Sequence, residues 1–211
     1  MNESLVKKRQ PGLRERQRAA RRQGILFAAG DLFATSGFEA TSLEDVAARA
    51  EVSVPTIYSF FKSKQELLLG LVEEDRHLSG PKLAALIERL PTQPIDAFVE
   101  IGRAMLLEGY DVGQKAVWRE IMAASFKVAV DQRNKFQELQ VVNANYIKSA
   151  IDKLCDAGRL RADLDRDSAL RLIQGIIRRV FQSYVLSEEM SVDDMMESLV
   201  QDLRTLIVGL K

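Results

Sequence analysis

The sequence has little of what catalytic or disulfide-bonded proteins use. Its 211 residues include one cysteine, one histidine and one tryptophan. The single thiol, Cys155, excludes an internal disulfide and fits a reducing compartment. The chain also lacks a glycine-rich phosphate loop, a nucleophile motif and metal-ligand spacing. We therefore expect no enzymatic activity, no catalytic residue, no metal and no cofactor.

Proline, glycine and long apolar runs are scarce as well. Five prolines and 12 glycines leave little material for the frequent turns of an all-β fold. No segment approaches the ~18 apolar residues of a membrane span, and the charged N-terminus lacks the apolar core of a signal peptide. These absences predict a soluble, cytoplasmic, all-α protein that has no membrane partner.

The formal net charge is zero, but the charge is unevenly distributed. Residues 1–64 contain 11 basic and 7 acidic side chains, which leaves 19 basic and 23 acidic ones for the rest of the chain. The first segment is thus net +4 and the remainder net −4. A basic head on an acidic body is typical of proteins that bind nucleic acid, although a basic run can also serve only solubility.

Helical periodicity and capping residues divide the chain. They predict helices over 18–36, 40–50 and 54–60, then one from Lys64 toward Ser79 that ends or kinks at Gly80-Pro81 before the period resumes over 83–90. Five further helices are expected near 95–110, 114–128, 131–157, 166–187 and 191–209. The resulting domains are a basic arm (1–17), a tri-helical head (18–63), a connecting helix (64–90) and a helical body (91–211).

Two short helices joined by a three-residue turn, behind a longer supporting helix, form a helix-turn-helix. The head resembles the N-terminal domain of TetR-family regulators in apolar, small, capping and basic positions together. The positions that carry the resemblance are Ile25-Leu26-Phe27-Ala28-Ala29, Leu32-Phe33-Ala34, Gly37-Phe38, Ala40-Thr41-Ser42-Leu43, Asp45-Val46-Ala47, Val52-Ser53, Thr56-Ile57-Tyr58, Phe61, Lys64 and Leu67-Leu68. The resemblance covers about a third of the chain and implies a dimeric repressor that binds palindromic double-stranded operator DNA.

The resemblance also implies roles for individual residues. Phosphate contacts are expected from Thr56, Tyr58 and Lys64, and from Thr41 or Ser42 at the start of the second helix. Base edges are left to Val54, Pro55, Ser59 and Phe60. Members commonly carry a polar residue at the position of Phe60, so this side chain and Val54 favour contacts with thymine methyl groups. Arg14 and Arg18 represent the basic arm, which is expected to follow phosphates or enter the minor groove.

The body is expected to bind a small-molecule inducer and to dimerise. Aromatic and methionine residues favour a flat or flexible apolar ligand, although residues of this kind are more often packed core. The ligand candidates are Phe98, Met105, Trp118, Met122, Phe126, Asn143, Tyr146 and Gln174. The two last helices carry more apolar surface than one stripe requires, so a homodimer is expected. The interface candidates are Ile176, Val180, Leu199, Leu203 and Ile207. A helical adaptor that binds proteins rather than DNA stays open as an alternative.

Overall fold

The computed structural model describes residues 12–109, 111, 114–127 and 130–210, apart from the side chains of residues 124–140, 209 and 210. These residues are organised entirely around α-helices, which confirms the predicted fold class. No helix in the described ranges is long and apolar enough to cross a membrane. The first 11 residues of the predicted arm, and the side chain of Phe126, lie outside the described part of the chain.

The helices fall close to the predicted ranges. Their bounds are α1 Leu13–Thr35, α2 Leu43–Arg49, α3 Val54–Phe60, α4 Lys64–Glu88, α5 Pro94–Leu107, α6 Lys115–Lys127, α7 Val130–Asp156, α8 Arg166–Leu186 and α9 Val192–Leu210.

Serine caps set the start of each helix after α1 in the head. Ser42, Ser53 and Ser63 each accept a hydrogen bond from the backbone N–H three residues on, which satisfies a donor that the first turn leaves free. Gly37 follows α1 with a φ of +86°, a conformation that favours glycine. Sequence reasoning placed these boundaries well because each depends on residues within one turn of the helix end.

The start of α1 differs from the prediction. The helix begins at Leu13 rather than near Arg18, and the side chain of Glu15 accepts the N–H of Gly12 at 2.8 Å. A carboxylate in the first turn satisfies a free donor and complements the helix dipole. Residues 13–17 are therefore helical, and Arg14 lies on a rigid element rather than in a flexible arm.

The helix α4 continues through Gly80-Pro81, where an end or a kink was expected. Pro81 cannot donate to the carbonyl of His77, but both residues are exposed, so water can replace that bond. The turn is also held by Ser79 Oγ, which donates to the carbonyl of Asp75 at 2.9 Å, and by the fully buried Leu83. The head and the body are thus joined by one helix of 25 residues.

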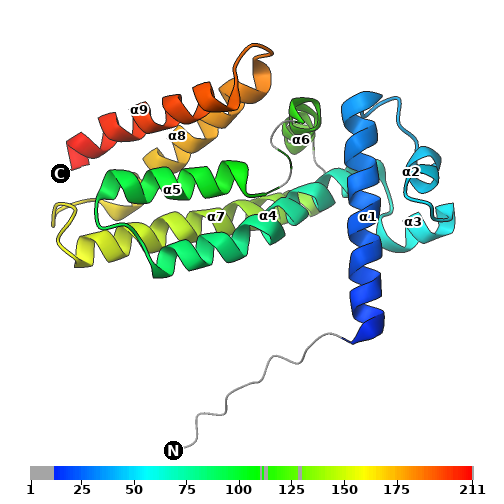
Figure 1. The fold of residues 1–211 in the computed structure, drawn as a ribbon, viewed down its shortest axis with the longest axis horizontal. Coiled ribbons are helices and arrows are strands. Elements are labelled where there is room, and N and C mark those ends of the chain that lie inside the picture. Colours follow the sequence, from blue (N-terminus) through cyan, green and yellow to red (C-terminus); the bar gives the residue numbers. More distant parts are fainter. Residues whose placement is uncertain (1–11, 110, 112–113, 128–129, 211) are drawn as a thin grey trace, which may run out of the picture.

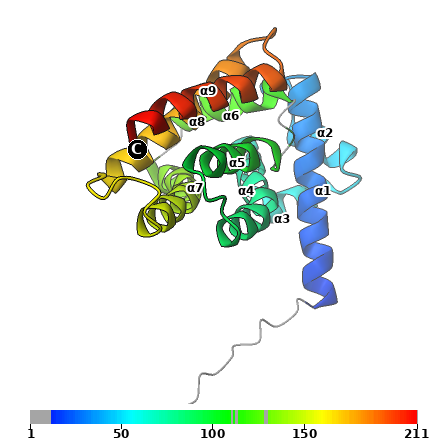
Figure 2. The same cartoon turned by 60° about the vertical axis from the view of Figure 1, so that its left-hand side comes forward.

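The helix α1 stands across the end of the bundle, with α2 and α3 on its outer side (Figure 1). In the body, α4, α5 and α7 run side by side and α8 and α9 cover them (Figures 1 and 2). Two glycines permit close helix crossings. A Cβ at Gly70 would lie 2.8 Å from Leu26 of α1, and one at Gly102 would lie 2.7 Å from Leu199 of α9.

Candidate nucleic-acid interface

The head presents α3 on a small apolar core. Ile57 and Phe61 point inward and are buried, together with Val46 and Ala47 of α2. The opposite side of α3 is open: Pro55, Tyr58 and Ser59 are exposed, and 53% of Tyr58 is accessible. A two-turn helix with one buried and one exposed side is narrow enough to enter a DNA major groove.

The short polar side chains of α3 are held close to its backbone. The hydroxyls of Ser53 and Thr56 lie 2.8 Å apart, and Ser59 Oγ donates to the carbonyl of Thr56 at 2.7 Å. Thr56 and Val54 are half-buried. The predicted DNA-facing surface of α3 is therefore dominated by the Tyr58 phenol and the ring of Phe60.

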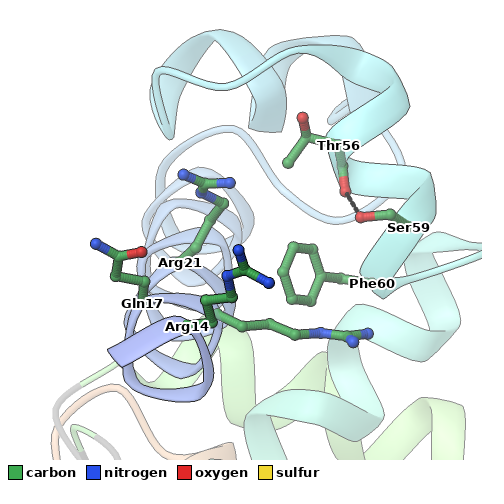
Figure 3. Close-up of a pocket in the computed structure, with 7 residues that line it drawn as sticks. Arg14, Gln17, Arg21, Thr56, Ser59 and Phe60 are labelled. Atoms are coloured by element: carbon green, nitrogen blue, oxygen red, sulfur yellow. Dashed lines mark hydrogen bonds between the residues drawn. The ribbon is translucent and has the colours of Figure 1, made fainter. Parts of the chain in front are cut away.

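A groove of about 480 Å³ lies between the N-terminal half of α1 and the outer side of α3. Figure 3 shows the arginines of α1 reaching toward α3 around the ring of Phe60. The groove is lined by Arg14, Gln17, Arg18, Arg21, Thr56, Ser59 and Phe60. We call it the α1–α3 groove. Three guanidinium groups beside hydroxyl donors suit a phosphate, because arginine presents a planar fork of N–H donors.

Arginines of α1 also stack on the two aromatic residues at the end of α3. The guanidinium carbon of Arg18 lies 5.4 Å from the ring centre of Phe60, and that of Arg22 lies 5.4 Å from the ring centre of Phe61. These contacts fall within the range of a cation–π attraction. The contact with Arg18 holds the ring of Phe60 on the side that faces α1, so the position of this ring depends on α1 as well as on α3.

The sequence pointed to Arg14 and Arg18 as site residues, counted Arg21 only as part of the basic run, and gave no role to Gln17. A helical reading of residues 13–22 would have placed Arg14, Gln17, Arg18 and Arg21 on one face, because they are spaced by three and four residues. The signal was present in the sequence, but Arg14 and Gln17 were assigned to the arm because the predicted helix began only at residue 18.

Two of the predicted phosphate contacts also have partners within the chain, and their contact with DNA stays a prediction. Thr41 is only 3% exposed and its hydroxyl donates to the carbonyl of Gly37 at 2.8 Å, so it supports the turn after α1, and of the two alternatives Thr41 and Ser42 it is the less accessible. Lys64 Nζ donates to the carbonyls of Phe38 and Glu39 at 2.8 and 3.1 Å. It also lies 4.7 Å from the ring centre of Phe38. Lys64 therefore fastens α4 to the loop after α1.

Ser42 sits at the cap of α2 and shares its bonds with Asp45. Ser42 Oγ and the backbone N–H of Ser42 both donate to the carboxylate of Asp45, at 2.6 and 2.9 Å. These hydrogen bonds lower the pKa of Asp45 from its ordinary value. The half-buried hydroxyl therefore serves the cap of α2, and its predicted contact with a phosphate is not tested by the structure.

A polar junction, which the sequence did not reveal, ties α1 to α4. Arg22 Nη2 donates to Glu73 Oε2 at 2.5 Å, and Gln23 Nε2 donates to Glu74 Oε1 at 2.6 Å. Arg22 Nη1 also lies 3.8 Å from Glu74 Oε2. We call these four residues the α1–α4 junction. Because Glu74 is only 6% exposed, these partners replace the hydration that its carboxylate loses on burial.

The described ligand candidates occupy four helices of the body. Phe98 and Met105 of α5 and Trp118 of α6 are buried, whereas Met122, Asn143, Tyr146 and Gln174 are half-buried. Trp118 Nε1 donates to the carbonyl of Asp111 at 3.1 Å, and its ring packs edge-on against Phe181 at 5.1 Å. The α1–α3 groove and a second groove of about 260 Å³ near Leu90 and Arg159 stand out in the described part of the chain. Neither includes these seven side chains.

Most of the residues predicted to form the dimer interface are buried inside the single chain. Val180, Leu199 and Leu203 are fully buried and Ile207 is 2% exposed, while Ile176 is half-buried. These four side chains are not available to a second copy in this structure, because other helices of the same chain cover them: α9 packs against α5 and α8, and α8 also packs against α6 and α7. The exposed apolar residues of α8 and α9 are instead Leu172, Leu186 and Val208, which are 50, 59 and 71% accessible.

Comparison with known proteins agrees with the geometry of the head. Residues 25–71 match the model of the family described as bacterial regulatory proteins, tetR family. The regulator UidR of Escherichia coli K12 is 25% identical over 194 residues, which cover 90% of this chain and 92% of UidR. An HTH-type transcriptional repressor of Mycobacterium tuberculosis is 40% identical over 95 residues, which cover 43% of this chain and 48% of that protein.

Solved structures show the same fold over most of the chain. FadR of Bacillus subtilis, solved with stearoyl-CoA, superposes with a TM-score of 0.74 at 18% identity and covers 90% of this chain and 99% of its own. A regulator of Saccharomonospora viridis, solved with choline, gives 0.70 at 21% identity and covers 90 and 96%. The chain belongs to the TetR family of helix-turn-helix transcriptional regulators, a non-enzymatic family.

Proposed function

We propose that this protein is a cytoplasmic repressor that binds a palindromic operator as a homodimer and releases it when a small molecule enters the body. The observation that carries the proposal is the α1–α3 groove. It places three arginines directly beside the exposed side of the recognition helix α3. Phosphates on the rim of a major groove would meet these arginines when α3 lies inside it.

The distribution of charge also favours DNA binding by the head rather than by the body. The net +4 of the first 64 residues favours DNA at the head, and the net −4 of the remainder disfavours it elsewhere. A two-turn helix reads few base pairs, so two copies related by a twofold axis are needed to select one site in a genome. A palindromic operator follows from that symmetry.

We place the dimer contact on the outer side of α8 and α9. Leu172, Ile176 and Leu186 recur on one stripe of α8. Arg179 is paired with Asp202 across the two antiparallel helices, which brings Val208 level with Leu172. An exposed apolar stripe on adjacent helices is suited to a second copy of itself, which would complete a four-helix contact.

Effector binding in the body is supported by its relatives. Structures of the same fold contain stearoyl-CoA in one protein and choline in another. In this chain, the body contributes Trp118 and Phe181 in edge-on contact and Met122 on the same helix as Trp118. Side chains of this kind favour a ligand that is largely apolar.

Selection of bound duplexes from a random pool tests DNA binding. We expect one inverted repeat to be enriched and the affinity for it to fall steeply with salt. Arg14→Ala and Arg18→Ala should each reduce the slope of log K against log salt by about one. Arg16→Ala is the matched control, because Arg16 is exposed on α1 but does not line the groove. Equal effects at Arg16 and Arg18 would contradict the role of the groove.

Sedimentation velocity tests the dimer. Leu172→Glu and Val208→Glu should each shift the protein toward monomer, because a charge would be buried in an apolar contact. The control is Val141→Glu on α7, where the side chain is 55% exposed and lies on another helix. If both variants of α8 and α9 remain dimeric at micromolar concentration, the contact lies elsewhere.

A further inference from the structure

Two buried polar atoms lack hydrogen-bond partners among the described residues. They are Nε of Arg76 on α4 and Oδ1 of Asn143 on α7. Unpaired buried polar groups are uncommon because each loses its hydration without compensation. One is a donor and the other is an acceptor, so a single group that both accepts and donates would satisfy the pair.

The register of α4 and α7 places the two residues opposite each other. Tyr146 Oη donates to the carbonyl of Gly80 at 3.3 Å, and Lys153 Nζ donates to the carbonyl of Ile87 at 2.7 Å. Both contacts join residues 66 positions apart, so the helices run in parallel at that offset. The residue level with Arg76 is then 142, one position from Asn143.

Helical spacing also turns both residues toward the contact between the helices. On α4, Arg76 precedes Gly80 by four residues and Ile87 by eleven, which puts all three on one stripe. On α7, Asn143 precedes Tyr146 by three residues and Lys153 by ten. The unpaired donor and acceptor therefore share one end of the α4–α7 contact, one turn before the Tyr146–Gly80 bond.

The charge of Arg76 is already neutralised. Arg76 Nη1 is paired with the carboxylate of Asp75, and the side chains of Arg76 and Asp75 are only 22 and 5% exposed. A Cβ at Gly109 would fall 1.9 Å from Asp75 Oδ1, so Asp75 is closely packed. Because the Arg76–Asp75 ion pair has no net charge, a ligand carboxylate or phosphate would lose its hydration here without a compensating charge, whereas an uncharged group would lose much less.

We infer that Arg76 and Asn143 form the polar anchor of the effector site and that they bind an uncharged hydroxyl or amide group at the end of a largely apolar molecule. This inference rests on the proposed function, since it places the effector in the body. Arg76 Nε would donate to the oxygen of that group. Asn143 Oδ1 would accept a hydrogen bond from the O–H or N–H of the same group.

Thermal unfolding of the full-length protein tests the anchor without knowledge of the natural effector. Asn143→Leu should raise the Tm of the ligand-free protein by about 2–4 °C, because it removes an unpaired buried acceptor. Asn145→Leu is the matched control, since Asn145 is exposed on the same helix. Arg76→Lys keeps the charge beside Asp75 but lacks the Nε–H.

Ligand chemistry is tested with three probes that share an octyl chain: octan-1-ol, octanoate and octyltrimethylammonium. Octan-1-ol should raise the Tm of the wild type by about 2–4 °C at a few times its Kd, and more than either ion does. This response should be lost in Asn143→Leu, weakened in Arg76→Lys and kept in Asn145→Leu. A lower Tm for ligand-free Asn143→Leu, a preference for octanoate, equal responses in all variants, or no response to any probe would overturn the inference.

Binding of the selected operator by each variant, measured without a probe, separates this inference from the proposed function. Asn145→Leu should bind the operator as the wild type does, because Asn145 is exposed on α7 of the body and belongs to neither the anchor nor the head. If the wild type selects no DNA, the proposed function fails. If it selects DNA and the probe responses are not as expected, only the anchor fails.

Discussion

The α1–α4 junction allows a quantitative test of how the head is fastened to the body. Glu74 is 6% exposed, and it accepts from Gln23 at 2.6 Å and lies 3.8 Å from Arg22. Replacement by alanine would leave the amide of Gln23 without this acceptor and Arg22 with Glu73 alone. The perturbation is therefore Glu74→Ala, with Glu74→Gln as the variant that keeps an acceptor but removes the charge.

The expected cost follows from the burial of each partner. Removal of one member of a fully buried ion pair costs about 3–5 kcal/mol. Arg22 is 31% exposed and keeps its 2.5 Å bond to Glu73, so most of that penalty does not apply. The unpaired amide of Gln23 contributes about 1–3 kcal/mol. We expect Glu74→Ala to lower the free energy of unfolding by about 2 kcal/mol, and Glu74→Gln to lower it by less.

Urea unfolding at a fixed protein concentration measures this loss, because dimerisation makes apparent stability depend on concentration. Asp31→Ala is the control. Asp31 bonds Arg49 at 2.9 Å with both side chains about half exposed, so its removal should cost less than about 1 kcal/mol. If Glu74→Ala destabilises the protein no more than Asp31→Ala does, the junction does not fasten the head as described.

Two further predictions concern DNA readout and acid stability. In a gel-shift titration, Tyr58→Phe should weaken binding about equally across operator variants, since a phosphate contact carries no base information. Phe60→Ala should lose about 1–3 kcal/mol of binding free energy, and the loss should differ from one base substitution to another. The reverse pattern would exchange the two roles. Hydrogen bonds from Ser191 lower the pKa of Asp194 below its ordinary value of 3.8, so the cap of α9 should stabilise the fold above that pH and be lost as the pH falls further. The Tm of Asp194→Asn should therefore change less than that of the wild type between pH 5 and about pH 3, and parallel curves would exclude this cap as a source of acid sensitivity.

The head was predictable because its signals are local. Ser42, Ser53 and Ser63 each mark a helix start through a bond within the same turn, and Gly37 marks a stop through its own backbone. The apolar period then placed Ile57 and Phe61 inward, as the structure confirms. Each feature is decided by residues within about four positions, which is the range over which a helix pattern can be interpreted.

Features that depend on contacts between distant segments were not predictable. The Lys64 ammonium donates to two carbonyls that lie 25 and 26 residues earlier in the chain. These contacts depend on how α4 packs at the end of α1. The burial of Leu199 depends on Gly102 of α5, which lets the two helices approach. An apolar stripe indicates that one face of a helix is buried, but it does not show whether the same chain or a second copy of the protein buries that face.

One turn of α4 carries contacts to both halves of the molecule. Glu74 bonds Gln23 of the head, and Arg76 lies level with Asn143 of the body, two residues later. The two side chains have different partners, and α4 is the element that they share, so we expect energetic coupling between them to pass through the position of α4. An effector bound at Arg76 would then act on the head through about 3 Å of helix rise.

A double-mutant cycle measures this coupling without a ligand. If α4 shifts as one body between a DNA-bound and a released arrangement, the losses of stability in Glu74→Ala and Arg76→Lys should deviate from additivity by more than about 0.5 kcal/mol. The control cycle joins Glu74→Ala with Arg103→Ala, because Arg103 is exposed on α5 and lies 3.9 Å from Glu100 of the same helix. That cycle should be additive, because the two sites share no partner. Urea unfolding of the single and double variants gives both values. Additivity in both cycles would mean that α4 does not transmit the state of the body to the head.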